Sequence, residues 1–153
     1  MKKKFRLPTS PKGQSLVELA ISITILVYLL SGAVEFGIAF FQFVQLRDAA
    51  QEGALYGSLN PPANSDVNDP NRLDIIERAE ASSSSPIDLA NDLAVNVEGE
   101  VTDGQYCEGG SLEVRITYPH QVFMPFIEVI TGGTIPLTAT VTDTILTPVC
   151  PPP

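Results

Sequence analysis

Three residues near the start of the chain could support proteolytic processing and an ion pair between subunits. Glu18 lies five residues after Gly13 in the stretch KGQSLVELAI, where a long apolar run begins. Cleavage after Gly13 leaves Gln14 as the new N-terminus, with a free amine about one helical turn before the Glu18 carboxylate. That carboxylate can neutralise the amine of a neighbouring subunit when such helices bundle with a stagger. The alternative is an acid in the first helical turn that reaches the lipid headgroups and favours the positive end of the helix dipole.

Charge is distributed unevenly along the 153 residues. Five of the nine Lys and Arg residues lie in the first twelve positions, which contain no Asp or Glu. Beyond Gly13, four basic residues stand against eighteen acidic ones. This acidic body is unsuited to binding nucleic acid, because phosphates need Lys or Arg to replace their counterions. A basic head before an apolar segment predicts that residues 1–13 form a cytoplasmic leader and that the acidic body is exported.

The apolar run is long enough to cross a membrane. As a helix it extends about 50 Å, whereas the hydrocarbon core needs about 30 Å. We therefore expect one long helix over residues 14–58, with its transmembrane part at about residues 16–44, ended by the prolines that follow. A cleaved secretory signal with a cut at residues 31–33 is the alternative. An acid near its start and the apolar stretch after the cut both argue against that alternative.

The helix also carries two longer motifs. The sequence GAVEFG occupies Gly32–Gly37, and AAQEGALY occupies Ala49–Tyr56. Together with Gly13 and Glu18, these motifs closely resemble TadE-like pseudopilins, which are minor pilin-like proteins of tight-adherence (Tad/Flp) type IV pilus and secretion systems. The resemblance covers about the first 58 residues. The family-like positions of the helix are Glu35, Phe36, Gly37, Glu52 and Gly53.

The resemblance implies a cleavable leader and a set of partners. Glu18 is then the processing and assembly glutamate, and a prepilin peptidase cuts between Gly13 and Gln14. The implied partners are other pilin-like subunits bound through the N-terminal helix, the prepilin peptidase, an inner-membrane assembly platform with its motor ATPase, and the membrane lipid. The implied location is the bacterial cytoplasmic membrane, crossed once, with the C-terminal domain outside the cytoplasm or in a surface pilus.

Two further features of the helix are interpreted from position. Glu35 lies about 25 Å from Glu18 along the axis and about 100° around it. An acid at the outer headgroup level is favoured over a buried ion pair, because an acid deep in lipid is costly.

Small residues let helices approach closely. We expect Gly53 and Gly57 to pack on the chain's own exported domain. The small residues expected to contact other subunits are Gly32, Ala33, Gly37 and Ala39.

The remainder of the chain predicts a small α+β domain, pilin-like in architecture. Residues 59–70 form a turn-rich linker, residues 71–148 the exported domain and residues 149–153 a Pro-rich tail. Asp69-Pro70 is a helix start, because a capping side chain precedes proline at the first position. A second short helix is expected at residues 86–93.

Alternating apolar and polar residues predict a sheet of roughly three antiparallel strands. The expected strands lie near residues 95–101, 112–118 and 135–145. Gly99 is a candidate bulge, and Gly109-Gly110 is expected to make the turn between the first two strands. Asp143 falls on the apolar face of the third strand, which is therefore expected to end or bend there.

Catalytic and metal-binding patterns are missing from the sequence. The serine run at residues 82–85 has no glycine elbow or partnering histidine, and the single His120 has no nearby cysteine or acid pair. We expect no cofactor and no metal.

Cys107 and Cys150 both lie in the exported part, where an oxidising compartment allows one disulfide. Two unpaired thiols are the alternative.

The sequence thus predicts a membrane-anchored minor pilin-like subunit with no enzymatic activity. The second hypothesis is a single-pass binding or sensor module that keeps residues 1–13 and never assembles. The third is a secreted enzyme released by cleavage at Ala33, for which the sequence offers no chemical site.

Overall fold

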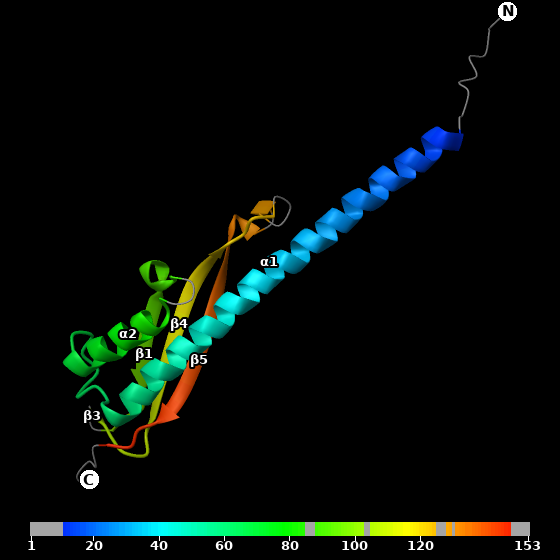
Figure 1. Ribbon diagram of the computed structural model, residues 1–153. Coiled ribbons are helices and arrows are strands. Elements are labelled where there is room, and N and C mark those ends of the chain that lie inside the picture. The colour runs from blue at the N-terminus through cyan, green and yellow to red at the C-terminus, as the bar shows by residue number, and fades with distance from the viewer. Residues whose placement is uncertain (1–10, 85–87, 103–104, 125–127, 130, 148–153) are drawn as a thin grey trace, which may run out of the picture.

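One long helix organises the molecule. The computed structural model describes residues 11–84, 88–102, 105–124, 128–129 and 131–147. Helix α1 (Pro11–Leu59) has 49 residues, which is about 70 Å at 1.5 Å per residue. Its N-terminal half projects away from a small domain that packs on its C-terminal half (Figure 1). Residues 13–31 are all exposed, and α1 is long and apolar enough to cross a membrane.

Capping residues explain the ends of the other helical elements. Helix α2 (Pro70–Ser82) starts as predicted, with the Asp69 carboxylate accepting from two N–H groups of the first turn. The helix expected at residues 86–93 is not formed as predicted. Residues 88–93 contain only the 3₁₀ turn η1 (Ala90–Asp92), and residues 85–87 lie outside the described part. Leu89 precedes this turn without a side-chain cap of its own, and the Asp88 carboxylate accepts from the Ala90 N–H at 3.1 Å, so the segment closes as a single short turn.

A three-stranded antiparallel sheet completes the α+β fold that the sequence predicted. Its order is β1 (Ala94–Gly99), β4 (Ser111–Gln121) and β5 (Thr134–Thr144), with the long central strand β4 paired to both neighbours. The register joins Val97 to Val114 and Val114 to Val141. Alternate side chains of β4 are buried, as the pattern at residues 112–118 predicted. Strand β5 extends one residue past Asp143.

The connection between β1 and β4 differs from the predicted turn. Strand β1 ends at Gly99, and Val101 belongs instead to β2 (Val101–Thr102), which pairs with β3 (Gln105–Tyr106) in a separate ribbon. A Cβ at Gly99 would lie 2.6 Å from the Ser111 carbonyl oxygen, so this is a close backbone approach. Gly109, at a φ of 87°, forms the turn that leads into β4. The ribbon therefore lies between the two strands that the sequence joined directly.

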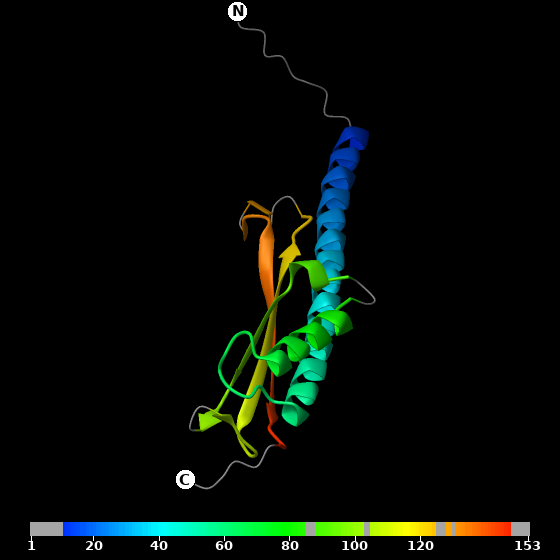
Figure 2. The same cartoon turned by 90° about the vertical axis from the view of Figure 1, so that its left-hand side faces the viewer.

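The core lies between α1, α2 and one face of the sheet. Helix α1 packs on α2, β4 and β5, and α2 also contacts β1 (Figures 1 and 2). The helix contributes small side chains at this contact, and the sheet contributes larger ones. Fully or almost fully buried residues include Leu46, Ala49, Ala50, Ala54, Ile75, Ala79, Leu112, Val114 and Ile116.

Two glycines of α1 permit this close packing. A Cβ at Gly57 would lie 2.2 Å from Leu112 Cδ2 and 2.9 Å from Ile75 Cδ1. A Cβ at Gly53 would lie 3.3 Å from the Ala79 Cβ and 3.4 Å from Val114 Cγ1. The prediction that Gly53 and Gly57 pack on the chain's own domain is confirmed.

We predict that Gly57→Ala destabilises the domain, because the added methyl overlaps Leu112 and Ile75. Overpacking of this kind costs about 1–3 kcal/mol. Replacing glycine by alanine inside a helix gains about 1 kcal/mol, so we expect the overpacking cost to be the larger of the two at this fully packed position. The measurement is thermal unfolding of the full chain in detergent micelles. Gly37→Ala is the matched control, because a Cβ there meets no atom within 4 Å. Equal melting temperatures for the two variants would contradict the packing.

Candidate interaction site on the N-terminal helix

A polar cluster joins the middle of α1 to the end of β4. The His120 ring places Nε2 at 3.2 Å from Glu35 Oε1 and Nδ1 at 2.6 Å from Gln42 Oε1. The Phe123 N–H donates to the same Glu35 oxygen at 3.0 Å. The His120 side chain is 2% exposed and that of Glu35 is 12% exposed. We call these four groups the Glu35 clasp.

The clasp is chemically complementary in either charge state of the imidazole. An imidazolium donates from both ring nitrogens, to the Glu35 carboxylate and to the Gln42 amide oxygen. In the neutral ring, Nε2–H donates to Glu35, and a turned Gln42 amide donates to Nδ1. Burial makes each of these hydrogen bonds costly to lose, since an unpaired polar group away from water is unfavourable. The clasp therefore holds the β4 end against the helix.

The sequence favoured Glu35 as an acid at the outer headgroup level over a buried ion pair, but in the structure its largely buried carboxylate is paired with the His120 ring. Its carboxylate accepts hydrogen bonds from the Phe123 N–H and from the ring of the buried His120, both in the chain's own small domain. His120 looks isolated in the sequence because its partners Glu35 and Gln42 lie 85 and 78 positions away. A signal was present, because Glu35 and Gln42 are seven residues apart and share one face of an apolar helix.

The second motif, Ala49–Tyr56, forms the surface of α1 on which the small domain packs. Ala49, Ala50 and Ala54 are buried against it. At the edge of this contact, Arg78 of α2 lies 3.6 Å from the Glu52 carboxylate and stacks 4.6 Å above the Tyr56 ring. These groups are partly exposed, so they add little stability beyond orienting α2. Glu52 thus lies at the exposed edge of the α1–α2 contact, and Gly53 lies inside it next to Ala79.

Other helix positions point away from the domain. The Phe36 side chain is 71% exposed and stacks on Phe40, with ring centroids 6.1 Å apart. Gly37 has no neighbour within 4 Å of a built Cβ. In contrast, a Cβ at Gly32 would lie 3.8 Å from Met124 Sδ, so Gly32 faces its own domain rather than open space. The small residues predicted to contact other subunits are therefore divided between two faces.

The predicted processing positions lie at the exposed N-terminal end of α1. Gly13, Gln14 and Glu18 are all exposed and helical. Glu18 makes no hydrogen bond or ion pair with the described residues of its own chain. Its carboxylate is therefore free to meet a group on another molecule.

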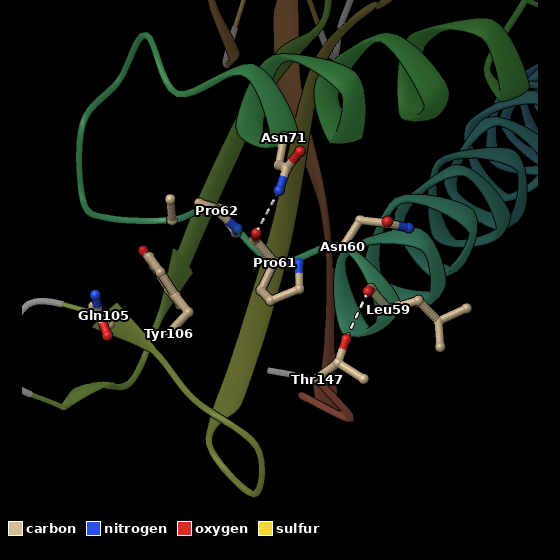
Figure 3. Close-up of a pocket in the computed structure, with 9 residues that line it drawn as sticks. Leu59, Asn60, Pro61, Pro62, Asn71, Gln105, Tyr106 and Thr147 are labelled. Carbon is tan, nitrogen blue, oxygen red and sulfur yellow. Dashed lines mark hydrogen bonds between the residues drawn. The ribbon is translucent and has the colours of Figure 1, made fainter. Parts of the chain in front are cut away.

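A pocket at the opposite end of α1 has no catalytic lining. It encloses about 340 Å³ between the end of α1, the linker and the β2–β3 ribbon (Figure 3). Asn71 Nδ2 donates to the Pro61 carbonyl at 2.8 Å, and Thr147 Oγ1 donates to the Leu59 carbonyl at 2.9 Å. These polar groups close the helix end, and the nine lining residues include no acid, histidine or cysteine. Over the described ranges, no three His, Cys, Asp or Glu residues gather as a metal site.

The predicted disulfide falls partly beyond the described residues. Cys107 follows β3, at the beginning of the turn that leads to β4. Cys150 lies outside the described part of the chain. Their pairing remains a prediction.

Comparison with known proteins identifies the helix. Residues 13–55 match the family model described as TadE-like protein, which confirms the resemblance over this segment. This match suggests a protein related to the Tad pilus, and with the apolar helix it suggests membrane anchoring. No curated protein and no solved structure matched the chain.

We predict that Glu35→Ala loosens the end of β4, because the Phe123 N–H and the His120 ring lose their acceptor. Loss of one such hydrogen bond should speed amide exchange at Phe123 about fivefold to tenfold. The measurement is hydrogen–deuterium exchange of peptides covering residues 119–124 in the full chain.

Glu113→Ala is the control for this experiment. Glu113 pairs with Arg115 at 2.8 Å and raises the pKa of Arg115 through that hydrogen bond, but the pair lies on the open face of the sheet. Its loss should leave residues 119–124 unchanged. Unaltered exchange in Glu35→Ala would show that the clasp does not hold the strand.

Proposed function

We propose, from the TadE-like match of residues 13–55, that the chain is a membrane-anchored minor pilin or pseudopilin subunit that takes part in assembly of a Tad/Flp-type pilus. The observation that carries the proposal is the division of α1 into two halves. Residues 13–31 are exposed throughout, and Glu18 is their only charged residue, whereas the C-terminal half of α1 is covered on one face by the chain's own domain. One half is suited to lipid or other helices, and the other presents a domain. The proposed role is structural, without catalysis.

The packing supports a shorter lipid-embedded segment than residues 16–44. Gln42 is bonded to His120, and Gln45 Nε2 donates to the Ser83 carbonyl at the end of α2 at 2.7 Å. Lipid does not accommodate such a polar domain surface at the same depth. We infer that the hydrocarbon span runs from about Leu16 to Glu35, which is about 28 Å of helix and close to the thickness of the bilayer core.

The basic head and the acidic body support the proposed orientation. Positive residues before a span favour its cytoplasmic side, so the domain from α2 onward lies outside the cytoplasm. The proposed location is a single pass through the bacterial cytoplasmic membrane, with transfer to a surface pilus during assembly.

An exposed aromatic stripe supports contact with other pilin-like subunits. Phe36, Phe40, Phe43 and Val44 are between 37% and 71% exposed and lie on a side of α1 that the domain leaves open. They follow directly on the proposed lipid-facing segment. A helix of a second pilin-like subunit presents the matching apolar surface, and burial of these side chains would contribute about 25 cal/mol for each Å² removed from water.

Glu18 provides the proposed ion pair of assembly. After removal of residues 1–13, the Gln14 amine of one subunit lies at the level of the Glu18 carboxylate of a staggered neighbour. An unpaired carboxylate in lipid is costly, so its neutralisation favours the bundled state. A prepilin peptidase and an inner-membrane assembly platform are the further partners proposed for this cycle.

A second candidate function is an unprocessed, single-pass binding or sensor module. One observation favours it, because the Gly13–Gln14 bond lies inside α1, which begins at Pro11. A peptidase must unwind this first turn before it can cut. The two candidates differ in the N-terminus of the mature protein.

We predict that protein from membranes of its own host starts at Gln14 and that Gly13→Val prevents this cleavage. The reason is that a β-branched side chain at position 13 crowds the peptide bond that the proposed peptidase must reach. Intact mass measurement with terminal peptide mapping checks the result. A Cβ at Gly13 meets no atom within 4 Å, so the substitution leaves the packing intact.

Ser31→Val serves as the control, since it changes an exposed position of the same helix and should not affect cleavage. Full-length chains in working pili would contradict the processing step and favour the sensor module.

A further inference from the structure

The turn between β4 and β5 lies beside the middle of α1, at the height of the proposed outer membrane boundary. Its described residues are 121–124, 128–129 and 131–134, which we call the β4–β5 tip. In both ribbon views the tip extends along α1 toward the projecting N-terminal half (Figures 1 and 2).

Two contacts fix the height of the tip on the helix. The Phe123 N–H donates to Glu35 Oε1 at 3.0 Å. The second contact is at Gly32, three residues before Glu35 on the helix. A Cβ at Gly32 would lie 3.8 Å from Met124 Sδ. The tip is therefore level with Gly32–Glu35, where about 28 Å of helix counted from Leu16 brings the chain to the far side of the hydrocarbon core.

The tip exposes large apolar side chains at this level. Phe123 is 72% exposed and Val129 is 85% exposed, while Val122 and Met124 between the tip and the helix are buried. Glu128 is the charged side chain among the described residues of the tip. Exposed apolar residues grouped on a loop need a partner, and here they continue the apolar surface of α1.

The backbone of the tip is suited to an apolar environment. Val122 N–H donates to the Gly133 carbonyl at 3.0 Å, and Gly132 N–H donates to the Glu128 carbonyl at 2.9 Å. Glu128 N–H donates in turn to the Met124 carbonyl at 2.9 Å. Polar groups that are already paired can leave water at low cost, which is the condition for contact with lipid.

We propose that the β4–β5 tip is an interfacial anchor that inserts Phe123 and Val129 into the outer leaflet of the membrane that α1 crosses. This inference rests on the proposed span of α1. The ligand is a lipid surface rather than a specific anionic headgroup, because the described tip offers Glu128 and no cation. Attachment at both the helix and the tip fixes the tilt of the domain on the membrane, with Glu35 as the link between them.

The test uses tryptophan as a depth probe, because the natural chain contains none. Phe123→Trp places the probe on the tip and keeps the backbone N–H that bonds to Glu35. Leu26→Trp marks the proposed span, and Leu146→Trp marks an exposed position just beyond the far end of β5. Each full-length variant is reconstituted in phosphatidylcholine vesicles whose acyl chains are brominated near the glycerol or near the methyl end.

We expect shallow bromines to quench Phe123→Trp emission about twofold, as for a side chain buried about 5–10 Å into the interface. Deep bromines should quench Leu26→Trp more strongly than Phe123→Trp. Leu146→Trp should not be quenched. A Val129→Trp variant that behaves like Phe123→Trp would support the same result independently.

Failure of the inference is distinguishable from failure of the proposed span. If Leu26→Trp is quenched and Phe123→Trp is not, α1 spans the membrane and the tip anchor is wrong. If Phe123→Trp is unquenched but its emission shifts to the blue as the protein-to-lipid ratio rises, a second copy covers the tip, which also overturns the lipid proposal. If Leu26→Trp is unquenched, the span and the anchor both fail.

Discussion

The packing of the small α+β domain on the small-residue face of α1 is the constraint on which the rest of the structure depends. Alanines and glycines from Ala49 to Gly57 let α2 and β4 approach the helix closely, and no side chain fits at Gly57. Larger residues on this face would separate the helix from the sheet. A small domain of this size has a limited core, so a long helix that supplies one wall is a large part of its stability.

The Glu35 clasp lies near the N-terminal limit of this contact, one helical turn from the approach of Met124 to Gly32. Below it, toward the N-terminus, α1 is exposed and apolar; above it, one face is covered and carries glutamines bonded to the domain. A carboxylate at the boundary of the apolar half of a helix has a lower desolvation cost than one inside lipid. The Glu35 carboxylate is in addition paired with His120. The acid of the GAVEFG motif thus has a structural use within the monomer, in addition to any role between subunits.

Local sequence patterns predicted the elements whose type and buried face can be read from a few neighbouring residues. The length and polarity of α1 indicated a helix that could span a membrane, and alternation at Leu112, Val114 and Ile116 identified the central strand. The Asp69-Pro70 cap placed α2. In each case the information lies within a few neighbouring residues.

Long-range contacts were not predictable in the same way. His120 and Glu35 meet across 85 positions, and a strand's alternation tells which face is buried but not which helix residue it meets. The break after Gly99 was hidden because apolar alternation continues through it to Val101, so two short pairings looked like one strand. The α+β class of the small domain was thus predicted from the sequence. The contact between His120 and Glu35, which positions the domain on the helix, was not predicted.

The measurement that tests the central claim most directly is a photo-crosslinking scan along α1 in membranes of the protein's own host. A photoreactive residue is placed at one position at a time from Phe36 to Leu59. We predict crosslinks to other pilin-like subunits from the open side, such as Phe40. On the covered side, a photoreactive aromatic in place of the partly buried Tyr56 should crosslink within the chain. Crosslinks from Phe40 to no other subunit, while position 56 still reacts within the chain, would leave a folded anchor that does not assemble and would contradict the proposal.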